Sequence, residues 1–128
     1  MKPNLQLSIV IPVFNEEGTI KLLASSIENV LKHYSYELIF VDDCSTDSTL
    51  ATINSLDDSK IKLIVFNSNK GQSSALAAGI RLAIGKYIIT MDGDFQNDPF
   101  DIPKMIHMIS MENLDICLLY TSPSPRDT

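Results

Sequence analysis

The sequence predicts an α/β protein with a doubly wound, mostly parallel sheet, for which the strand order 3-2-1-4 is expected. Short apolar runs alternate with amphipathic stretches at the spacing of strand-helix-strand units. The apolar runs are continuous, as expected for strands that helices cover on both faces. A chain of 128 residues, 45% of them hydrophobic, can bury such a core within one domain.

The first strand and helix come before residue 32. Residues 7–13 are almost all apolar and rich in β-branched side chains, which predicts a buried strand. After a polar cluster at residues 15–18, apolar residues recur at steps of three and four and predict an amphipathic helix. These residues are Ile20, Leu23, Ile27, Val30 and Leu31.

The next units follow the same alternation. Residues 37–41 predict a second strand and residues 61–66 a third, with a short helix between them marked by Leu50, Ile53 and Leu56. Polar residues that suit a helix N-cap precede that helix. They are Ser45, Thr46, Asp47 and Ser48.

The second half of the chain continues the pattern. Residues 72–84 are rich in alanine and predict a helix that packs closely on the sheet, with Gly85 at its C-terminal stop. Residues 87–91 predict the fourth strand. Asp98 and Pro99 suit a cap and a helix start, and residues 115–119 predict a fifth strand.

A polar cluster directly follows each of the first four strands. The clusters are Phe14-Asn15-Glu16, Asp42-Asp43, Asn69-Lys70-Gly71 and Asp92-Gly93-Asp94. The carboxyl ends of parallel strands share one edge, where ligands bind at the point at which the strand order reverses. Loops after strands are often polar, but several carboxylates at one edge are costly without a cation.

Asp92 and Asp94 are the candidate metal ligands. Residues two apart in an extended chain point to the same side, although the motif alone is more often an ordinary turn. Few carboxylates suit Mg²⁺ or Mn²⁺ completed by water and phosphate oxygens, so a diphosphate ligand is expected. Asp42 and Asp43 could accept hydrogen bonds from a base or a ribose.

Charge and motif content argue against several other classes. A net charge of −6, with no Lys/Arg cluster, argues against a nucleic-acid partner. The sequence has neither a G-x-G-x-x-G fingerprint nor a G-x-x-x-x-G-K-[ST] phosphate loop. Cys44 and Cys117 suggest no disulfide framework. Without a signal peptide or an apolar run near the ~20 residues of a membrane span, a cytoplasmic chain is expected.

Four blocks, in this order, resemble family 2 glycosyltransferases of the GT-A fold. They are S-I-V-I-P-V-F-N-E at 8–16, V-D-D-C-S-T-D at 41–47, N-K-G at 69–71 with Ala75 and Gly79, and M-D-G-D-F-Q at 91–96. Gln96 and Pro99 resemble the branch that includes dolichyl-phosphate mannose synthase and bacterial polyprenyl-phosphate glycosyltransferases. The resemblance covers residues 6–116.

The resemblance implies inverting transfer of a hexose from a UDP- or GDP-sugar to an acceptor, expected to be a polyprenyl phosphate. It implies that Asp92 and Asp94 hold Mg²⁺ or Mn²⁺ on the donor diphosphate, that Asp42 and Asp43 contact base and ribose, and that Gln96 lies near a donor or acceptor phosphate. The whole donor-binding set is Pro12, Phe14, Glu16, Asp42, Asp43, Lys70, Gly71 and Gln96. No catalytic base is assigned within this chain.

The sequence departs from the family after residue 116. The family continues its strand and soon presents an arginine-bearing motif, whereas this chain ends in a Ser-Pro repeat at 122–125, which is expected to be disordered. Residues 117–128 resemble translated sequencing-adapter read-through. Residues 1–116 are therefore expected to be the nucleotide-sugar-binding part of a truncated domain. The full-length protein is expected at the cytoplasmic face of a membrane.

Three alternatives stay open. The chain could be a non-catalytic nucleotide-binding module. A haloacid-dehalogenase-type phosphatase also ends a strand in Asp-x-Asp, but it carries the motif on its first strand and expects a Thr or Val where Gln96 stands. A response-regulator receiver is suggested by residues 40–43, but Asn67 stands where its phosphorylatable Asp would be.

Overall fold

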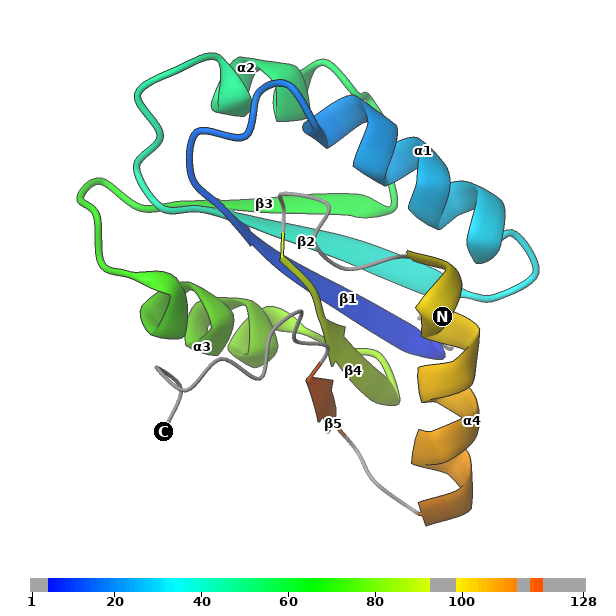
Figure 1. Ribbon diagram of the computed structural model, residues 1–128. Helices are drawn as coiled ribbons and strands as arrows, with labels where there is room; N and C mark the ends of the chain where they lie inside the picture. The colour runs from blue at the N-terminus through cyan, green and yellow to red at the C-terminus, as the bar shows by residue number, and fades with distance from the viewer. Residues whose placement is uncertain (1–4, 93–98, 113–115, 119–128) are drawn as a thin grey trace.

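A parallel sheet with helices on both faces forms the molecule (Figure 1). The computed structural model describes residues 5–92, 99–112 and 116–118. The predicted helices and strands are present, and their ends differ by no more than two residues except in the last helix, which was predicted to start at Pro99 and begins at Ile102. In chain order they are β1 (Leu7–Val13), α1 (Ile20–Val30), β2 (Tyr36–Asp42), α2 (Thr49–Asn54), β3 (Ile61–Val65), α3 (Gln72–Leu82), β4 (Tyr87–Thr90), the 3₁₀ turn η1 (Pro99–Asp101), α4 (Ile102–Glu112) and β5 (Ile116–Leu118).

The strand order is β3-β2-β1-β4-β5, and every pairing is parallel. This confirms the expected order 3-2-1-4 and adds β5 beyond β4. β1 lies at the centre, with Val13 opposite Asp42 of β2 and Val10 opposite Thr90 of β4. The strand order therefore reverses beside β1, where a ligand crevice was expected.

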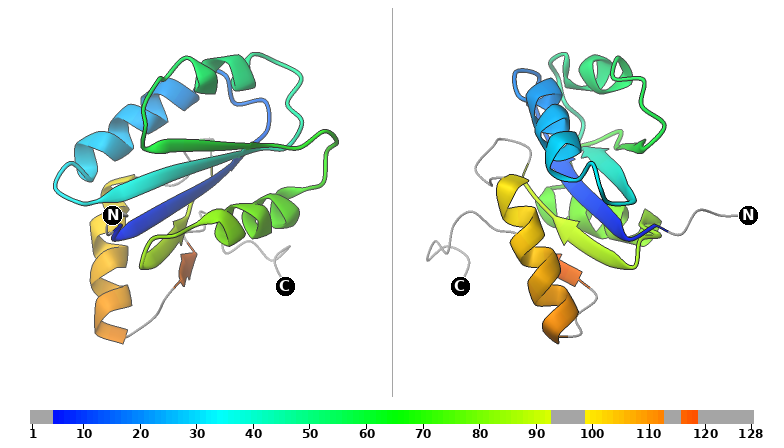
Figure 2. Two further views of the ribbon diagram at one scale, coloured as in Figure 1. Left: turned by 180° about the vertical axis from the view of Figure 1, so that it is seen from behind. Right: turned by 90° about the vertical axis from the view of Figure 1, so that its right-hand side faces the viewer.

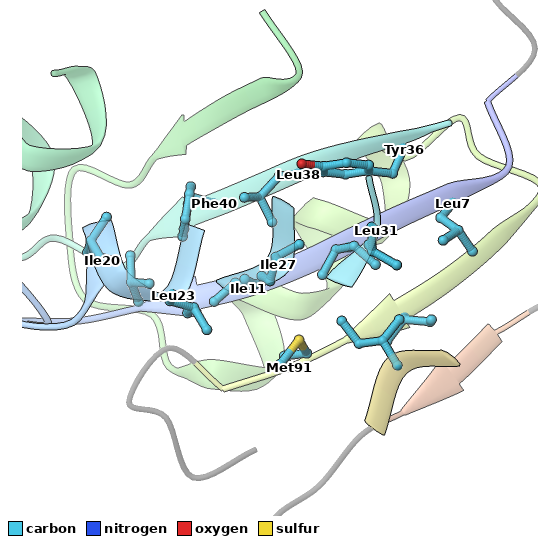
Figure 3. Close-up of a cluster of buried hydrophobic side chains, with 14 of the residues drawn as sticks. Leu7, Ile11, Ile20, Leu23, Ile27, Leu31, Tyr36, Leu38, Phe40 and Met91 are labelled. Atoms are coloured by element: carbon cyan, nitrogen blue, oxygen red, sulfur yellow. The ribbon is translucent and has the colours of Figure 1, made fainter. Parts of the chain in front are cut away.

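Helices α1, α2 and α4 cover one face of the sheet, and α3 covers the other (Figures 1 and 2). On the first face, side chains from α1 pack against alternate residues of β1, β2 and β4. Figure 3 shows Leu23 and Ile27 of α1 among Ile11, Phe40 and Met91. β1 is buried on both faces, because Val10 belongs to the separate core under α3. Continuous apolar strands are the sequence signature of this arrangement.

Small residues bring α3 close to the sheet, as its alanine-rich sequence predicted. Ala75 and Gly79 are the buried positions of this helix. A Cβ atom on Gly79 would lie 2.3 Å from Cγ1 of Val10. The side chain of Val10 is β-branched and stiff, so α3 can lie this close only with glycine at position 79.

The role predicted for Gly85 as the stop of α3 is wrong. The helix ends at Leu82, and Ala83 already has an extended backbone. Gly85 instead lies against β1, where an added Cβ would be 2.6 Å from the carbonyl carbon of Leu7 and 2.7 Å from the nitrogen of Ser8. The glycine is required by this close approach of two backbones.

The buried carboxylate of Glu37, at the amino end of β2, bonds both to β1 and to the turn between α3 and β4 that contains Gly85. Glu37 is 2% exposed and accepts hydrogen bonds from the Ser8 hydroxyl at 2.5 Å and the Ile84 N–H at 2.8 Å. Lys62 Nζ lies 2.6 Å from its other oxygen. Burial raises the pKa of Glu37, but Lys62, Ser8 and the Ile84 N–H outweigh it and hold the pKa below its ordinary 4.5.

Two expectations concern the chain after β4. The cap expected at Asp98 lies outside the described residues, and the chain resumes with η1 before α4. The expected boundary at residue 116 falls within β5, because Cys117 and Leu118 pair with Ile89 and Thr90. These two residues therefore belong to the sheet, and residues 119–128 lie outside the described part. Of the helices the structure describes, none has both the length and the apolar character to cross a bilayer.

Candidate functional site

The loops that follow β2 and β4 lie on either side of the end of β1. The N–H of Asp43 donates to the Val13 carbonyl at 2.9 Å, and the N–H of Met91 donates to the Val10 carbonyl at 3.0 Å. Asp43 and Asp92, the residue after Met91, therefore lie on either side of β1, which Figure 1 shows between β2 and β4. This is the convergence that the parallel sheet predicts.

Asp42 ends β2 and is 1% exposed. Its Oδ1 accepts the N–H of Ser45 at 3.3 Å and also the Ser45 hydroxyl. Its carbonyl accepts the N–H of Phe66 at 2.9 Å. The loop that follows Asp42 thus fixes the orientation of this carboxylate.

Asp43 connects the second polar cluster to the third. Its carboxylate accepts the N–H of Lys70 at 2.7 Å on Oδ1 and the N–H of Gly71 at 2.9 Å on Oδ2. Asn69 Nδ2 donates to the Asp43 carbonyl at 3.3 Å. Gly71 has a φ of +94°, which is unfavourable for residues with a side chain. Asp43 therefore holds the turn that starts α3.

The first cluster presents an aromatic side chain beside these carboxylates. Phe14 is 44% exposed, while Pro12 and Glu16 are half-buried. The N–H of Glu16 donates to the hydroxyl of Thr49 at 2.8 Å. An exposed ring at a site lined with carboxylates could stack on a nucleotide base.

Lys70 contributes its backbone N–H to Asp43, but its ammonium group lies elsewhere. Nζ stands 4.9 Å from the centre of the Phe66 ring, a cation–π contact at the end of β3. Its N–H is thus bonded to Asp43 and its ammonium group lies over Phe66, and the donor-binding role of Lys70 stays a prediction.

Asp92 follows β4 and contacts the first residue of α3. Its Oδ1 accepts a hydrogen bond from Gln72 Nε2 at 2.9 Å. Asp94 and Gln96, the other predicted residues of this motif, lie outside the described residues. Oxygen donors of this kind are those that Mg²⁺ and Mn²⁺ prefer, so Asp92 fits the expected cation. Among residues 5–92, 99–112 and 116–118, no three His, Cys, Asp or Glu side chains form a metal site by themselves.

Sequence reasoning gave Asp47 and Ser48 only a capping role and gave Glu17 none, but all three organise these loops. Ser48 is the N-cap of α2 but makes no capping bond with its side chain. Instead, the Asp47 carboxylate accepts the N–H of Thr49 at 2.8 Å and its hydroxyl at 2.5 Å, and Glu17 accepts the N–H of Ser48 at 2.7 Å. Desolvation raises the pKa of Asp47, but the two bonds from Thr49 outweigh it and lower the pKa. The run of N-cap residue types at 45–48 was the available signal.

The strand order, with helices on both faces of a parallel sheet, defines the chain as an α/β domain of the GT-A type. The family model described as "Glycosyl transferase family 2" matches residues 8–122. The chain belongs to this family. The match does not support the phosphatase and receiver alternatives, and Asp92 follows the fourth strand, whereas the phosphatase carries its motif on the first.

Two curated relatives are similar in sequence to this chain over almost all of its length. The dodecaprenyl-phosphate galacturonate synthase of Rhizobium johnstonii is 40% identical over 118 residues, which are 88% of this chain and 35% of that protein. The undecaprenyl-phosphate 4-deoxy-4-formamido-L-arabinose transferase of Yersinia pestis is 40% identical over 120 residues, or 90% of this chain and 36% of that protein. This chain therefore spans about a third of the length of these relatives.

Solved structures share the fold. TarS of S. aureus in complex with UDP-GlcNAc superposes with a TM-score of 0.69 at 22% identity, over 85% of this chain and 32% of that one. The mannosyltransferase PcManGT from Pyrobaculum calidifontis, in complex with GDP-Man and Mn²⁺, gives a TM-score of 0.63 at 22% identity, over 70% and 27%. At this identity the two structures support the fold alone.

Proposed function

We propose that this chain is the nucleotide-sugar-binding part of an inverting, metal-dependent hexosyltransferase. Its donor would be a UDP- or GDP-sugar, and its acceptor a polyprenyl phosphate such as undecaprenyl or dolichyl phosphate. The acceptor class is supported by the names of the two curated relatives, each 40% identical to this chain. The donor class is supported by the ligands bound to the two structures of the same fold.

The observation that carries the proposal is the placement of Asp42 and Asp43 on one side of β1 and Asp92 on the other. In this arrangement the residues after β2 bind the base and ribose, and Phe14 supplies an exposed ring. Asp92, with Asp94, holds Mg²⁺ or Mn²⁺ beside the diphosphate. When bound, the cation neutralises charge that develops on the leaving diphosphate.

A phosphate acceptor explains why the proposed site needs no strong base. The second pKa of a phosphate monoester is about 6, so the acceptor is largely doubly ionised near neutral pH. A hydroxyl acceptor would need a positioned general base. We propose that the full-length protein meets its lipid acceptor at the cytoplasmic face of a membrane.

Calorimetric titration of this chain with UDP and GDP, with and without Mn²⁺, tests the donor site. We expect binding of one nucleotide that depends on the metal and is lost or weakened at least tenfold in Asp92→Asn and in Asp94→Ala, because each change removes a proposed metal ligand. Asp57→Asn is the matched control, since Asp57 is exposed in the loop before β3 and asparagine also tolerates its φ of 46°.

Two results would contradict the proposal: nucleotide binding that is insensitive to Mn²⁺, or binding that is unchanged in Asp92→Asn. Sugar transfer to a polyprenyl phosphate, measured on a reading frame as long as the curated relatives, separates an enzyme from a non-catalytic nucleotide-binding module. The module interpretation predicts nucleotide binding in both proteins and no transfer in either.

A further inference from the structure

We infer that Asn15 is a positioning residue that joins the loops after β1 and β2 into one preformed wall of the nucleotide site. The inference rests on the proposed function, because that function defines the ligand. It concerns a residue between Phe14 and Glu16 whose side chain points across to the other loop instead of serving as a ligand itself.

Asn15 binds the second loop with both its backbone and its side chain. Its N–H donates to Ser45 Oγ at 2.9 Å. Its Oδ1 accepts the N–H of Thr46 at 2.8 Å, the N–H of Asp47 at 3.3 Å and the Thr46 hydroxyl at 3.3 Å. One side-chain oxygen thus satisfies consecutive backbone donors of a loop thirty residues away in sequence.

These contacts lead directly to Asp42. Ser45 Oγ accepts from the Asn15 N–H and donates its own proton to Asp42 Oδ1. A chain of two hydrogen bonds therefore runs from the first loop to the carboxylate at the end of β2. Displacement of Asn15 would remove this link between the loops and leave Asp42 Oδ1 held by Ser45 alone.

The backbone conformation explains why asparagine occupies this position. Asn15 has a φ of 53°, and Cys44 on the facing loop has a φ of 63°. Non-glycine residues adopt this left-handed region at a cost, and asparagine tolerates it better than most. Two facing loops with unfavourable conformations persist when contacts between them hold both in place. Asparagine supplies the tolerated conformation and the acceptor together.

A preformed wall favours binding because a ligand need not order the loops as it binds. If Asn15 holds the wall, removing its side chain should weaken nucleotide binding and slow association while the sheet stays folded. Asn15→Gly removes the acceptor and keeps the left-handed backbone. Asn15→Asp keeps an acceptor oxygen and a residue type that tolerates this φ.

The experiment measures affinity and association rate for UDP and GDP with Mn²⁺, together with hydrogen exchange at the amides of Thr46 and Asp47. We expect Asn15→Gly to bind roughly tenfold more weakly, the size of one net hydrogen bond, with faster exchange at both amides. We expect Asn15→Asp to restore their protection. Asp57→Gly is the matched control, because it removes an exposed side chain from a left-handed residue outside the site.

The outcomes separate this inference from the proposed function. If the unchanged chain binds neither nucleotide, the proposed function fails, and amide exchange alone decides whether Asn15 holds the loop. If the unchanged chain binds and Asn15→Gly keeps its affinity, association rate and amide protection, the inference is overturned. It is also overturned if Asn15→Gly lowers affinity only as far as it lowers the folded fraction.

Discussion

At the scale of single residues, the close backbone contact at position 85 leaves no room for a side chain and therefore requires glycine. We expect Gly85→Ala to destabilise the fold by roughly 1–3 kcal/mol or more, because the atoms closest to the new Cβ include backbone atoms of β1 that cannot move aside. Chemical denaturation measures the change. Gly18→Ala is the control, since a Cβ there meets nothing within 4 Å. Equal stability of the two variants would show that β1 and the turn before β4 are less closely packed.

Glu37 makes the stability of the fold depend on pH in the acidic range. Its folded pKa lies below that of the free carboxyl, so the ionised form stabilises the fold. This stabilisation is complete above the ordinary pKa of 4.5 and is lost as the pH falls through the lower, folded value. We expect Glu37→Gln to be less stable at pH 7 by roughly 1–3 kcal/mol and to lose less stability than the unchanged chain between about pH 5 and pH 3.

Denaturation midpoints across that pH range test the expectation. Glu28→Gln is the control for loss of one carboxylate, because Glu28 is exposed on α1. Parallel pH curves for the unchanged chain and Glu37→Gln would mean that Glu37 does not contribute to the acid dependence.

At the scale of elements, one buried hydroxyl is among the contacts that connect the first loop to α2. Thr49 is fully buried, accepts the N–H of Glu16 and donates to Asp47. We expect Thr49→Val to cost about 1–3 kcal/mol, because it leaves that N–H without its acceptor. Thr49→Ser keeps the hydroxyl and should recover most of the loss. Thermal unfolding measures both, and a loss in Thr49→Ser with none in Thr49→Val would point to the methyl group instead.

The elements themselves could be predicted from the sequence, because hydrophobic periodicity reports burial directly. The continuous apolar runs of β1 and β2 and the three-four spacing of α1 gave their positions to within a residue or two. Contacts between loops could not be predicted in this way. The partners of Asn15 lie thirty residues or more away, and its short polar side chain carries no periodic signal. The end of α3 was predicted wrongly for a similar reason. Gly85 is required by its contact with β1 and not by the end of the helix.

At the scale of the whole molecule, net charge opposes the proposed ligand. The chain carries −6, and a nucleoside diphosphate is also anionic. Without a divalent cation we expect UDP or GDP to bind weakly, and more tightly as salt rises toward ~0.1 M, where the screening length falls to about 10 Å. Titrations at several salt concentrations test this, with uridine and guanosine as uncharged controls. A fall in affinity with added salt would indicate a cationic pocket instead.

The edge at which the site lies could also be predicted, because parallel strands place all their carboxyl ends together. The sequence could not predict that Asp42 and Asp43 have different hydrogen-bond partners. Both are acidic residues at the carboxyl end of the same strand, but Asp42 is held by its own loop and Asp43 holds the start of α3. That difference depends on the position of α3 on the opposite face of the sheet.

The central position of β1 has a consequence for synthesis on the ribosome. β1 can pair with β2 soon after residue 42 emerges, but its other edge pairs with β4, where Ser8 lies opposite Ile88. At roughly 5–20 residues per second, several seconds of translation separate the two events. During that time an apolar strand edge is open to other chains. The nascent protein should therefore need chaperone protection until β4 has been made.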